Sequence, residues 1–249
     1  MVTPMNDKVM PIPSYQPLYG QIKALLVNSL ASGEWKPGEM IPSEVELAAR
    51  FGVSQGTVRK AIDELATDNL LMRRQGRGTF VATHAEDSNT TRFLRFHADD
   101  GRDEGHESRL VDCRCGRAGP RAAIALGRSA GSAVVEVQRV LLFGGRPLIH
   151  EHLVLPGDAF AGLDATTIGD WQGSMYSLFE TRFGVRMIRA EERLTAVASP
   201  AAVSGLLDVA SGSPLLAVER VAYTYEDVPM EWRLGHYLTA GYHYLAALD

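Results

Sequence analysis

Charged residues stand on the apolar side of strand-like segments in the second half of this chain. Arg139 shares its side of VVEVQRVLLF with valine, leucine and phenylalanine, and Glu151 and Glu192 hold similar places in LIHEHLVL and MIRAEERLTA. An unpaired charge on a buried face costs several kcal/mol, so such a residue must either pair inside the protein or bind a polar ligand. Two alternatives follow: Arg139 and Glu151 pair across a hairpin, or they face a ligand together.

A short basic helix is the second stretch whose residue types point to chemistry. VSQGTVRKAIDEL, residues 53–65, begins like a turn and continues as a helix with Arg59 and Lys60 beside an apolar stripe. From Arg50 to Arg77 the chain has six basic and three acidic residues, although its net charge is −5. A basic segment on an acidic chain is typical of a nucleic-acid reader attached to another domain, with a solvated helix face as the alternative.

The segments around this helix occur in the order of a winged helix-turn-helix. Residues 15–32 have leucine and isoleucine at helical spacing, which predicts a supporting helix. Ser43 opens a capping-box sequence and Gly52 ends that second helix, while Ser54 begins a third helix that runs to about Asn69. LLMRRQGRGTFVAT then predicts a β-hairpin with a Gly-Arg-Gly tip. In this arrangement the third helix enters the major groove of DNA.

These residues resemble a known family. PLYGQIKALL, GEMIPSEVELAARFGVSQGTVRKAIDELATDNLL and RRQGRGTFV are similar to the N-terminal domain of GntR-type bacterial transcription regulators, over about residues 15–82. The resemblance implies a dimeric, ligand-controlled regulator, more often a repressor than an activator, that binds a short inverted repeat in double-stranded DNA. The family often has arginine where Val45 and Gln55 stand. Glutamine can still pair with adenine, whereas valine cannot make such a contact.

The DNA contacts are expected from two helix N-termini, the exposed side of the third helix and the hairpin tip. Arg59 is the strongest groove candidate, and Gly56 permits close approach of the backbone. Cap formation alone also explains Ser43 and Ser54, and solvation alone explains Arg73. The predicted DNA-binding set is Ser43, Glu44, Ser54, Gln55, Gly56, Thr57, Arg59, Lys60, Arg73, Arg74, Gly76, Arg77 and Gly78.

The rest of the chain predicts a linker and a second domain. We expect a disordered tail over residues 1–14, a DNA-binding domain over 15–82, a hinge-like linker over 83–91 and an effector-binding domain over 92–249. The second domain reads as strand, strand, helix, strand, helix, strand, strand, which predicts an antiparallel sheet with helices packed against it. The fold class is therefore α+β.

A weak internal repeat runs through that second domain. VEVQRVLLFGGRPLIHEHLVL and LAVERVAYTYEDVPMEWRLGHYL share V-x-R-V and a turn, and their alignment places Glu151 opposite Arg233. Two similar halves around one sheet would supply paired polar residues to a shared pocket. Simple hairpin similarity is the alternative explanation.

The second domain also resembles, more loosely and over about residues 90–248, the UTRA effector domain of one GntR subfamily, which has a chorismate-lyase-like fold. The resemblance rests on Arg139 with Glu151 twelve residues on, on SMYSLFE before FGVRMIRAEERLTAV, and on YHYL. It implies a pocket for a small polar metabolite such as an organic acid, a sugar or a sugar phosphate. Members that bind sugar phosphates commonly have a second arginine where this chain has Leu141. From this resemblance and the strand pattern, the predicted effector-binding set is Arg139, Glu151, Ser174, Tyr176, Glu192, Arg233 and Tyr242.

The composition excludes several other classes of protein. The chain has 249 residues, 45% hydrophobic and 22% charged, and no apolar run reaches the length of a membrane span. Cys113 and Cys115 predict two core thiols rather than a disulfide or zinc site, and HADDGRDEGHE predicts a solvated loop rather than a metal site.

We therefore expect a cytoplasmic, homodimeric transcription regulator that binds DNA and a small molecule and uses no cofactor, metal or membrane partner. It is not expected to be an enzyme. One alternative is an enzyme in which a chorismate-lyase-like domain is tethered to a DNA-binding module. A DNA-binding scaffold with an empty effector domain is the other.

Overall fold

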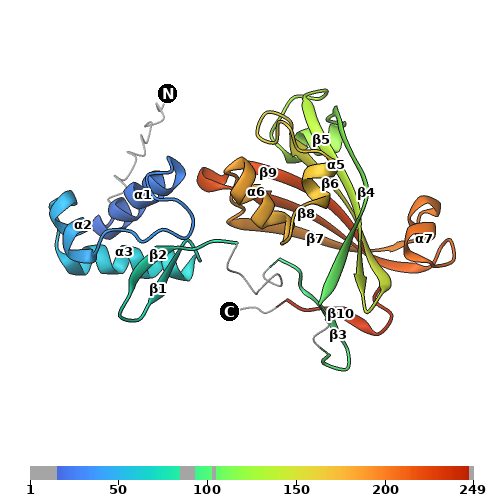
Figure 1. The fold of residues 1–249 in the computed structure, drawn as a ribbon, viewed down its shortest axis with the longest axis horizontal. Helices are drawn as coiled ribbons and strands as arrows, with labels where there is room; N and C mark the ends of the chain where they lie inside the picture. The colour runs from blue at the N-terminus through green and yellow to red at the C-terminus, as the bar shows by residue number, and fades with distance from the viewer. Residues whose placement is uncertain (1–15, 85–92, 103–104, 247–249) are drawn as a thin grey trace, which may run out of the picture. The chain divides into compact units, whose positions relative to one another are not determined.

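The computed structural model describes residues 16–84, 93–102 and 105–246, and the chain divides into two compact units between Ala82 and Thr83 (Figure 1). The predicted N-terminal tail and most of the predicted linker lie outside the described residues. In the described part, no helix is both long and apolar enough to cross a bilayer.

The first unit has the predicted winged helix-turn-helix order. Its elements are α1 (Leu18–Ala31), α2 (Glu44–Phe51), α3 (Gln55–Thr67), β1 (Leu71–Arg74) and β2 (Gly78–Val81). The apolar sides of the three helices meet in one core, where Leu26, Leu47 and Ile62 are fully buried. This burial leaves the opposite side of α3 exposed to solvent.

Local capping chemistry sets the ends of α2 and α3. The backbone N–H of Glu46 donates to the Ser43 hydroxyl at 3.3 Å, and the N–H of Ser43 donates to the Glu46 carboxylate at 2.8 Å. Gly52 then ends α2 with φ 65°, a backbone conformation that favours glycine. Ser54 caps α3 by accepting the N–H of Thr57 at 3.2 Å. The predicted capping box, turn and third helix are thereby confirmed.

The second unit is built on one antiparallel sheet with strand order β4-β5-β6-β9-β8-β7. Its strands are β4 (His106–Arg117), β5 (Ala133–Phe143), β6 (Arg146–Pro156), β7 (Arg189–Ala198), β8 (Pro214–Tyr223) and β9 (Pro229–Tyr237). The two repeated segments form the hairpins β5–β6 and β8–β9, which meet where β6 pairs with β9. The antiparallel α+β architecture is as predicted.

Helices cover both faces of this sheet (Figure 1). On one face α6 (Met175–Phe183), together with α5 (Ala165–Gly169), packs over an apolar cluster that includes Val137, Leu153 and Phe179. On the other face, α4 (Pro120–Ala125) packs near Trp232 and α7 (Ala201–Leu207) near Val140. A separate two-stranded sheet pairs β3 (Phe96–Ala98) with β10 (Tyr242–Tyr244), and a 3-10 turn (Tyr225–Asp227) precedes β9.

The edge strand β4 was not evident from the sequence pattern. Most of its side chains are exposed or half-buried, so its apolar residues do not alternate as those of β5 and β6 do. Cys113 is half-buried and Cys115 is exposed, so the expectation of two core thiols is wrong for Cys115. The pairing with β5 also shifts between Leu110 and Asp112, directly beside Arg139. Such bulges redirect side chains next to functional sites.

Candidate functional site

One surface of the first unit brings α2, α3 and the β1–β2 hairpin together. A groove of about 760 Å³ lies there, lined by Ser43, Glu44, Gln55, Arg73 and Gly76 among others. In the predicted DNA-binding set, Glu44, Thr57 and Arg74 are half-buried, whereas Ser43, Ser54, Gln55, Gly56, Arg59, Lys60, Arg73, Gly76, Arg77 and Gly78 are exposed.

Glu44 is the centre of this surface. Its carboxylate accepts hydrogen bonds from Arg59 Nε at 3.0 Å and from Gln55 Nε2 at 3.1 Å, both from α3. Arg73 Nη1, from the hairpin, lies 2.9 Å from the other oxygen of the same carboxylate. Bonds from Arg59, then from Arg73 and Gln55, hold the pKa of Glu44 below its usual range despite partial burial. Glu44 therefore orients three predicted DNA contacts from two elements.

Aromatic rings hold two of the other basic side chains. The Lys60 ammonium lies 3.8 Å from the ring centroid of Tyr19, and the Arg74 guanidinium lies 4.7 Å from that of Phe80. Both are cation–π contacts, which restrict a side chain without neutralising its charge. At the hairpin tip, Gly76 has φ 70°, as a narrow glycine turn requires.

The second unit contains a cavity of about 860 Å³ between α6 and the sheet. Its wall includes Arg139, Glu151, Ser174, Tyr176 and Arg233, five of the seven residues predicted to bind an effector. Aromatic and aliphatic side chains complete the lining, among them Phe93, Leu110, Leu141, Ile168 and Trp171. Polar and apolar groups thus share the wall about equally, and a cavity whose polar groups converge in this way suits a small polar molecule.

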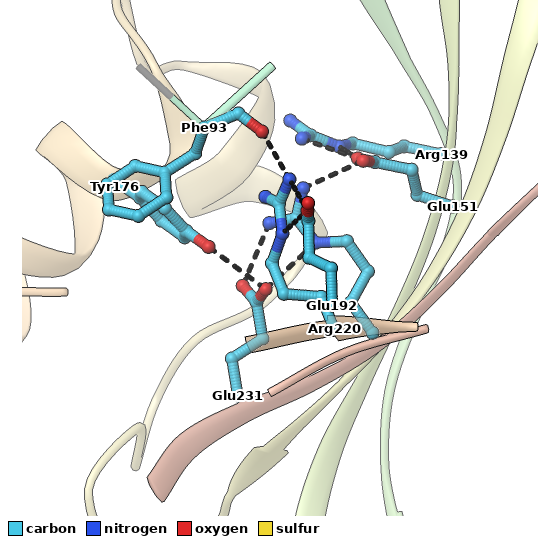
Figure 2. Close-up of polar contacts among 8 residues, drawn as sticks. Phe93, Arg139, Glu151, Tyr176, Glu192, Arg220 and Glu231 are labelled. Carbon is cyan, nitrogen blue, oxygen red and sulfur yellow. Dashed lines mark hydrogen bonds and ion pairs between the residues drawn. The ribbon is translucent and has the colours of Figure 1, made fainter. Parts of the chain in front are cut away.

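A chain of ion pairs connects residues of this cavity wall with Glu231 (Figure 2). Arg139 Nη2 lies 2.6 Å and Arg233 Nη1 lies 2.7 Å from the Glu151 carboxylate, which is fully buried. Arg233 also binds Glu231 through Nε and Nη2, both at 2.8 Å. The phenol of Tyr176 donates to Glu231 at 3.1 Å. The hairpin pairing of Arg139 with Glu151 is thus real, and both residues also face the cavity.

A third arginine, Arg220, lies beside Arg233 on the neighbouring strand and forms a separate ion pair. Arg220 Nε donates to Glu192 at 2.7 Å, and Arg220 Nη2 donates to the carbonyl oxygen of Phe93. The hydroxyl of Tyr244 donates to Glu192 from β10. The cluster therefore balances three arginines, at positions 139, 220 and 233, with three glutamates, at positions 151, 192 and 231.

The surrounding arginines keep Glu151 ionised. Burial alone would raise the pKa of Glu151, but the charges of the surrounding arginines outweigh burial and hold it well below its usual range. Burial, followed by the charge of Glu231, raises the pKa of Tyr176 to about 12. The phenol consequently remains a proton donor at neutral pH.

Arg139 keeps one guanidinium nitrogen available for a ligand. Its Nε and Nη2 both bind Glu151, while its Nη1 has no hydrogen-bond partner among residues 16–84, 93–102 and 105–246. Nearby, Ser174 caps α6 by accepting the N–H of Ser177 at 3.1 Å. Ser174 and Met175 line the cavity, and the first N–H groups of a helix have no partner within it. An anionic ligand group is therefore favoured between Arg139 and the start of α6.

Both halves of the chain match known families. Residues 18–81 match the model of bacterial regulatory proteins of the gntR family, and residues 101–243 match the UTRA domain model. The chain belongs to the GntR family and carries a UTRA domain. It is a ligand-responsive, DNA-binding transcription regulator and not an enzyme, as predicted.

Individual relatives resemble this GntR-family chain over most of their length. It is 28% identical over 244 residues to the HTH-type transcriptional repressor NagR of Bacillus subtilis, with 98% of each chain covered. It is 31% identical over 220 residues to the transcriptional regulator YurK of the same species, covering 87% of this chain and 89% of YurK. The crystal structure of the ligand-binding domain of a GntR-family regulator from Bordetella bronchiseptica shares 44% identity and a TM-score of 0.62, covering 64% of this chain and 98% of that one.

Two predicted effector residues of the UTRA domain do not line the cavity. Glu192 is not part of the cavity lining, but it pairs with Arg220, which lines the cavity. Tyr242 lies in an aromatic cluster instead, stacked at 5.1 Å on Phe96 and 5.9 Å from Phe143. Its neighbour Tyr244 is the tyrosine that reaches the ion-pair cluster.

Sequence reasoning missed two members of the UTRA cluster, Arg220 and Glu231. The repeated V-x-R-V motif contained the signal for Arg220, because it aligns that residue with Arg139. Glu231 stands two residues before Arg233 and hence on the same side of β9. Over the described part of the chain, which omits Asp103 and Glu104, no group of three or more metal-binding side chains is suitably placed for a metal ion.

Proposed function

We propose that this regulator is a cytoplasmic homodimeric repressor that binds an inverted-repeat operator, with its operator affinity set by a small polar metabolite in the UTRA cavity. The observation that carries the proposal is Arg139, a buried arginine with a free edge toward a cavity whose other charges are internally paired. The name of NagR, a transcriptional repressor, supports repression. A dimer suits an inverted repeat because each copy reads one half-site.

The effector is expected to carry a single anionic group. The three arginines of the cluster are already balanced by three glutamates, so a dianion would add charge that nothing in the cluster neutralises. Leu141 lines the cavity where sugar-phosphate-binding relatives of this subfamily commonly have a second arginine. Among organic acids, sugars and sugar phosphates, a small carboxylic acid therefore fits best.

Replacing Arg139 with glutamine is expected to remove the effector response while operator binding without effector is kept. The variant loses the free guanidinium edge of Arg139, so a carboxylate bound there loses its charged partner and about tenfold or more of its affinity. A thermal-shift screen of small acids, sugars and sugar phosphates on the wild type supplies the ligand. Equal stabilisation of wild type and variant by that ligand would place the binding site elsewhere.

Operator affinity is expected to fall steeply with salt. Two DNA-binding units that each bind several phosphates release many counterions, so affinity should drop about 10³-fold between 50 and 200 mM salt. The operator is first selected by the full chain from random duplexes, and fluorescence anisotropy then gives the slope. A flat slope would contradict binding dominated by phosphate contacts.

The two alternative functions, a DNA-binding scaffold and an enzyme, predict different results. A scaffold with an empty effector domain gives no thermal shift with any metabolite. An enzyme would turn over chorismate or a related acid, but the matched families and the named relatives are regulators, and none of them supports catalysis.

A further inference from the structure

The chain passes from the first unit to the second within one residue. The N–H of Ala82 donates to the carbonyl oxygen of Leu70 at 3.1 Å, at the base of the winged hairpin. The next residue, Thr83, donates through its hydroxyl to the Glu180 carboxylate on α6. The N–H of His84 donates to both oxygens of that carboxylate, at 3.2 and 3.3 Å. Ala82, which bonds within the first unit, is therefore followed directly by Thr83, which bonds within the second.

The acceptor of these bonds is fixed in place. The side chains of Glu180 and Arg186 are each 3% exposed, and Arg186 Nε lies 3.5 Å from the Glu180 carboxylate. His84 adds a second attachment, because its Nε2 lies 2.9 Å from the carbonyl oxygen of Met187. We call these contacts of Thr83, His84, Glu180 and Arg186 the Glu180 anchor.

The Glu180 anchor adjoins the effector cavity. His84 lines the cavity, and its ring lies 5.6 Å from that of Tyr176. Tyr176 and Glu180 are four residues apart on α6, so they lie on the same side of the helix. One helix therefore carries both a wall of the cavity and the attachment of the connection to the DNA-binding unit.

We propose that Glu180 is a positioning residue for operator recognition, which removes slack from the connection and so fixes the half-site spacing that a dimer accepts. The proposal rests on the proposed dimeric, operator-binding function. If the anchor is released, residues 83–92 become the connection, and they can span roughly 30 Å when extended. When the connection between the DNA-binding unit and the effector domain is short, a dimer binds both half-sites only if they lie at one distance from each other. A long connection lets the dimer bind half-sites at several distances. A metabolite in the cavity lies against His84 and thus acts on the same anchor.

The test uses the full chain and an operator selected by the wild type. In the double variant Glu180→Leu with Arg186→Met, apolar residues replace the buried ion pair, and Thr83 and His84 lose the Glu180 carboxylate as their acceptor. Affinity is measured for operators lengthened between the half-sites by one, two or three base pairs, each of which adds about 3.4 Å and rotates the second half-site by about 35°. The wild type is expected to lose about 100-fold in affinity at two added base pairs, and the variant less than about tenfold.

A matched control removes an exposed ion pair that takes no part in the Glu180 anchor. Arg128 and Asp158 pair at 3.0 Å, and Arg128→Gln with Asp158→Asn should keep the wild-type spacing profile. Thr83→Val keeps the buried ion pair and should broaden the profile partially, so it decides the matter if the double variant does not fold. Unchanged profiles in the variants would overturn the role of Glu180. Failure of the wild type to select any duplex would instead overturn the proposed function.

Discussion

Arg59→Ala is expected to reduce affinity for the selected operator by about 100-fold or more without changing the fold. A bidentate contact to a base contributes roughly 1–3 kcal/mol, and a dimer on an inverted repeat loses two such contacts. The Arg59 side chain is 57% exposed and takes no part in the core, so its truncation leaves the melting temperature almost unchanged. Anisotropy titrations of wild type and variant on the same duplex measure the loss.

A matched control for Arg59 is available on the neighbouring helix. Arg50 is also exposed and also pairs with a glutamate, but it contacts Glu34 and lies beside the rings of Trp35 and Phe51. Arg50→Ala removes the same charge and should change operator affinity by no more than a few fold. If Arg59→Ala behaves like Arg50→Ala, the groove assignment of α3 is wrong.

Glu44 orders the side chains that we expect to face DNA, and it does so without DNA. Gln55, Arg59 and Arg73 would otherwise sample many rotamers, and ordering such a side chain on binding costs about 0.5–1.5 kcal/mol. Because all three side chains bind the Glu44 carboxylate, they are already ordered in the free protein. The Gln55 amide uses one N–H to bind Glu44 and keeps the second for an adenine acceptor. Gln55 stands where the family often has arginine, so this adenine contact would replace the contact of that arginine.

Local signals in the sequence predicted the parts of the fold that local physics decides. The capping residues Ser43 and Ser54 and the glycine at 52 fixed the ends of α2 and α3, and alternation in β5 and β6 placed Arg139 and Glu151 on one face. These features depend on neighbours within a few residues or across one hairpin, so a sequence pattern can carry them.

The remaining features depend on partners that are distant in sequence. Thr83 and Glu180 are 97 residues apart, and nothing near Thr83 shows that it bonds to α6 rather than belonging to a free linker. Similarly, Tyr242 and Tyr244 both belong to the YHYL motif, but the pairing of β10 with β3 decides which of them packs against Phe96. Tertiary packing therefore decides which residues of a correctly identified motif reach the site.

Glu151→Gln is expected to destabilise the effector domain by about 3–5 kcal/mol, the cost of leaving a buried ionic group without its partner. Glu151 is fully buried and serves two arginines, so the neutral variant leaves Arg139 without a charged partner and Arg233 with Glu231 alone. For a unit of this size the melting temperature should fall by about 10 °C. Glu136→Gln is the control, because Glu136 pairs with the exposed Arg114 and its loss should cost less than about 1 kcal/mol.

The unfolding free energy at acidic pH provides a second test of Glu151. The pKa of Glu151 is held well below its ordinary value, so its contribution to stability is complete above its unfolded-state pKa of about 4.5 and is lost as the pH falls toward the folded-state pKa. The unfolding free energy of the wild type should decline through this acid range. Glu151→Gln should show a shallower decline, because glutamine does not titrate.

A double variant distinguishes the contribution of the ion-pair cluster to domain stability from its role in ligand binding. Arg139→Met with Glu151→Met removes one positive and one negative charge, and Arg233 keeps its bidentate bond to Glu231. Apolar replacement of a buried pair is often neutral or stabilising, so the melting temperature should recover most of the loss seen in Glu151→Gln. The effector response should nevertheless be absent, because the guanidinium edge of Arg139 no longer faces the cavity. A double variant that is as unstable as Glu151→Gln would mean that the fold itself requires the charges. Recovery of stability without response would mean that Arg139 and Glu151 serve the ligand.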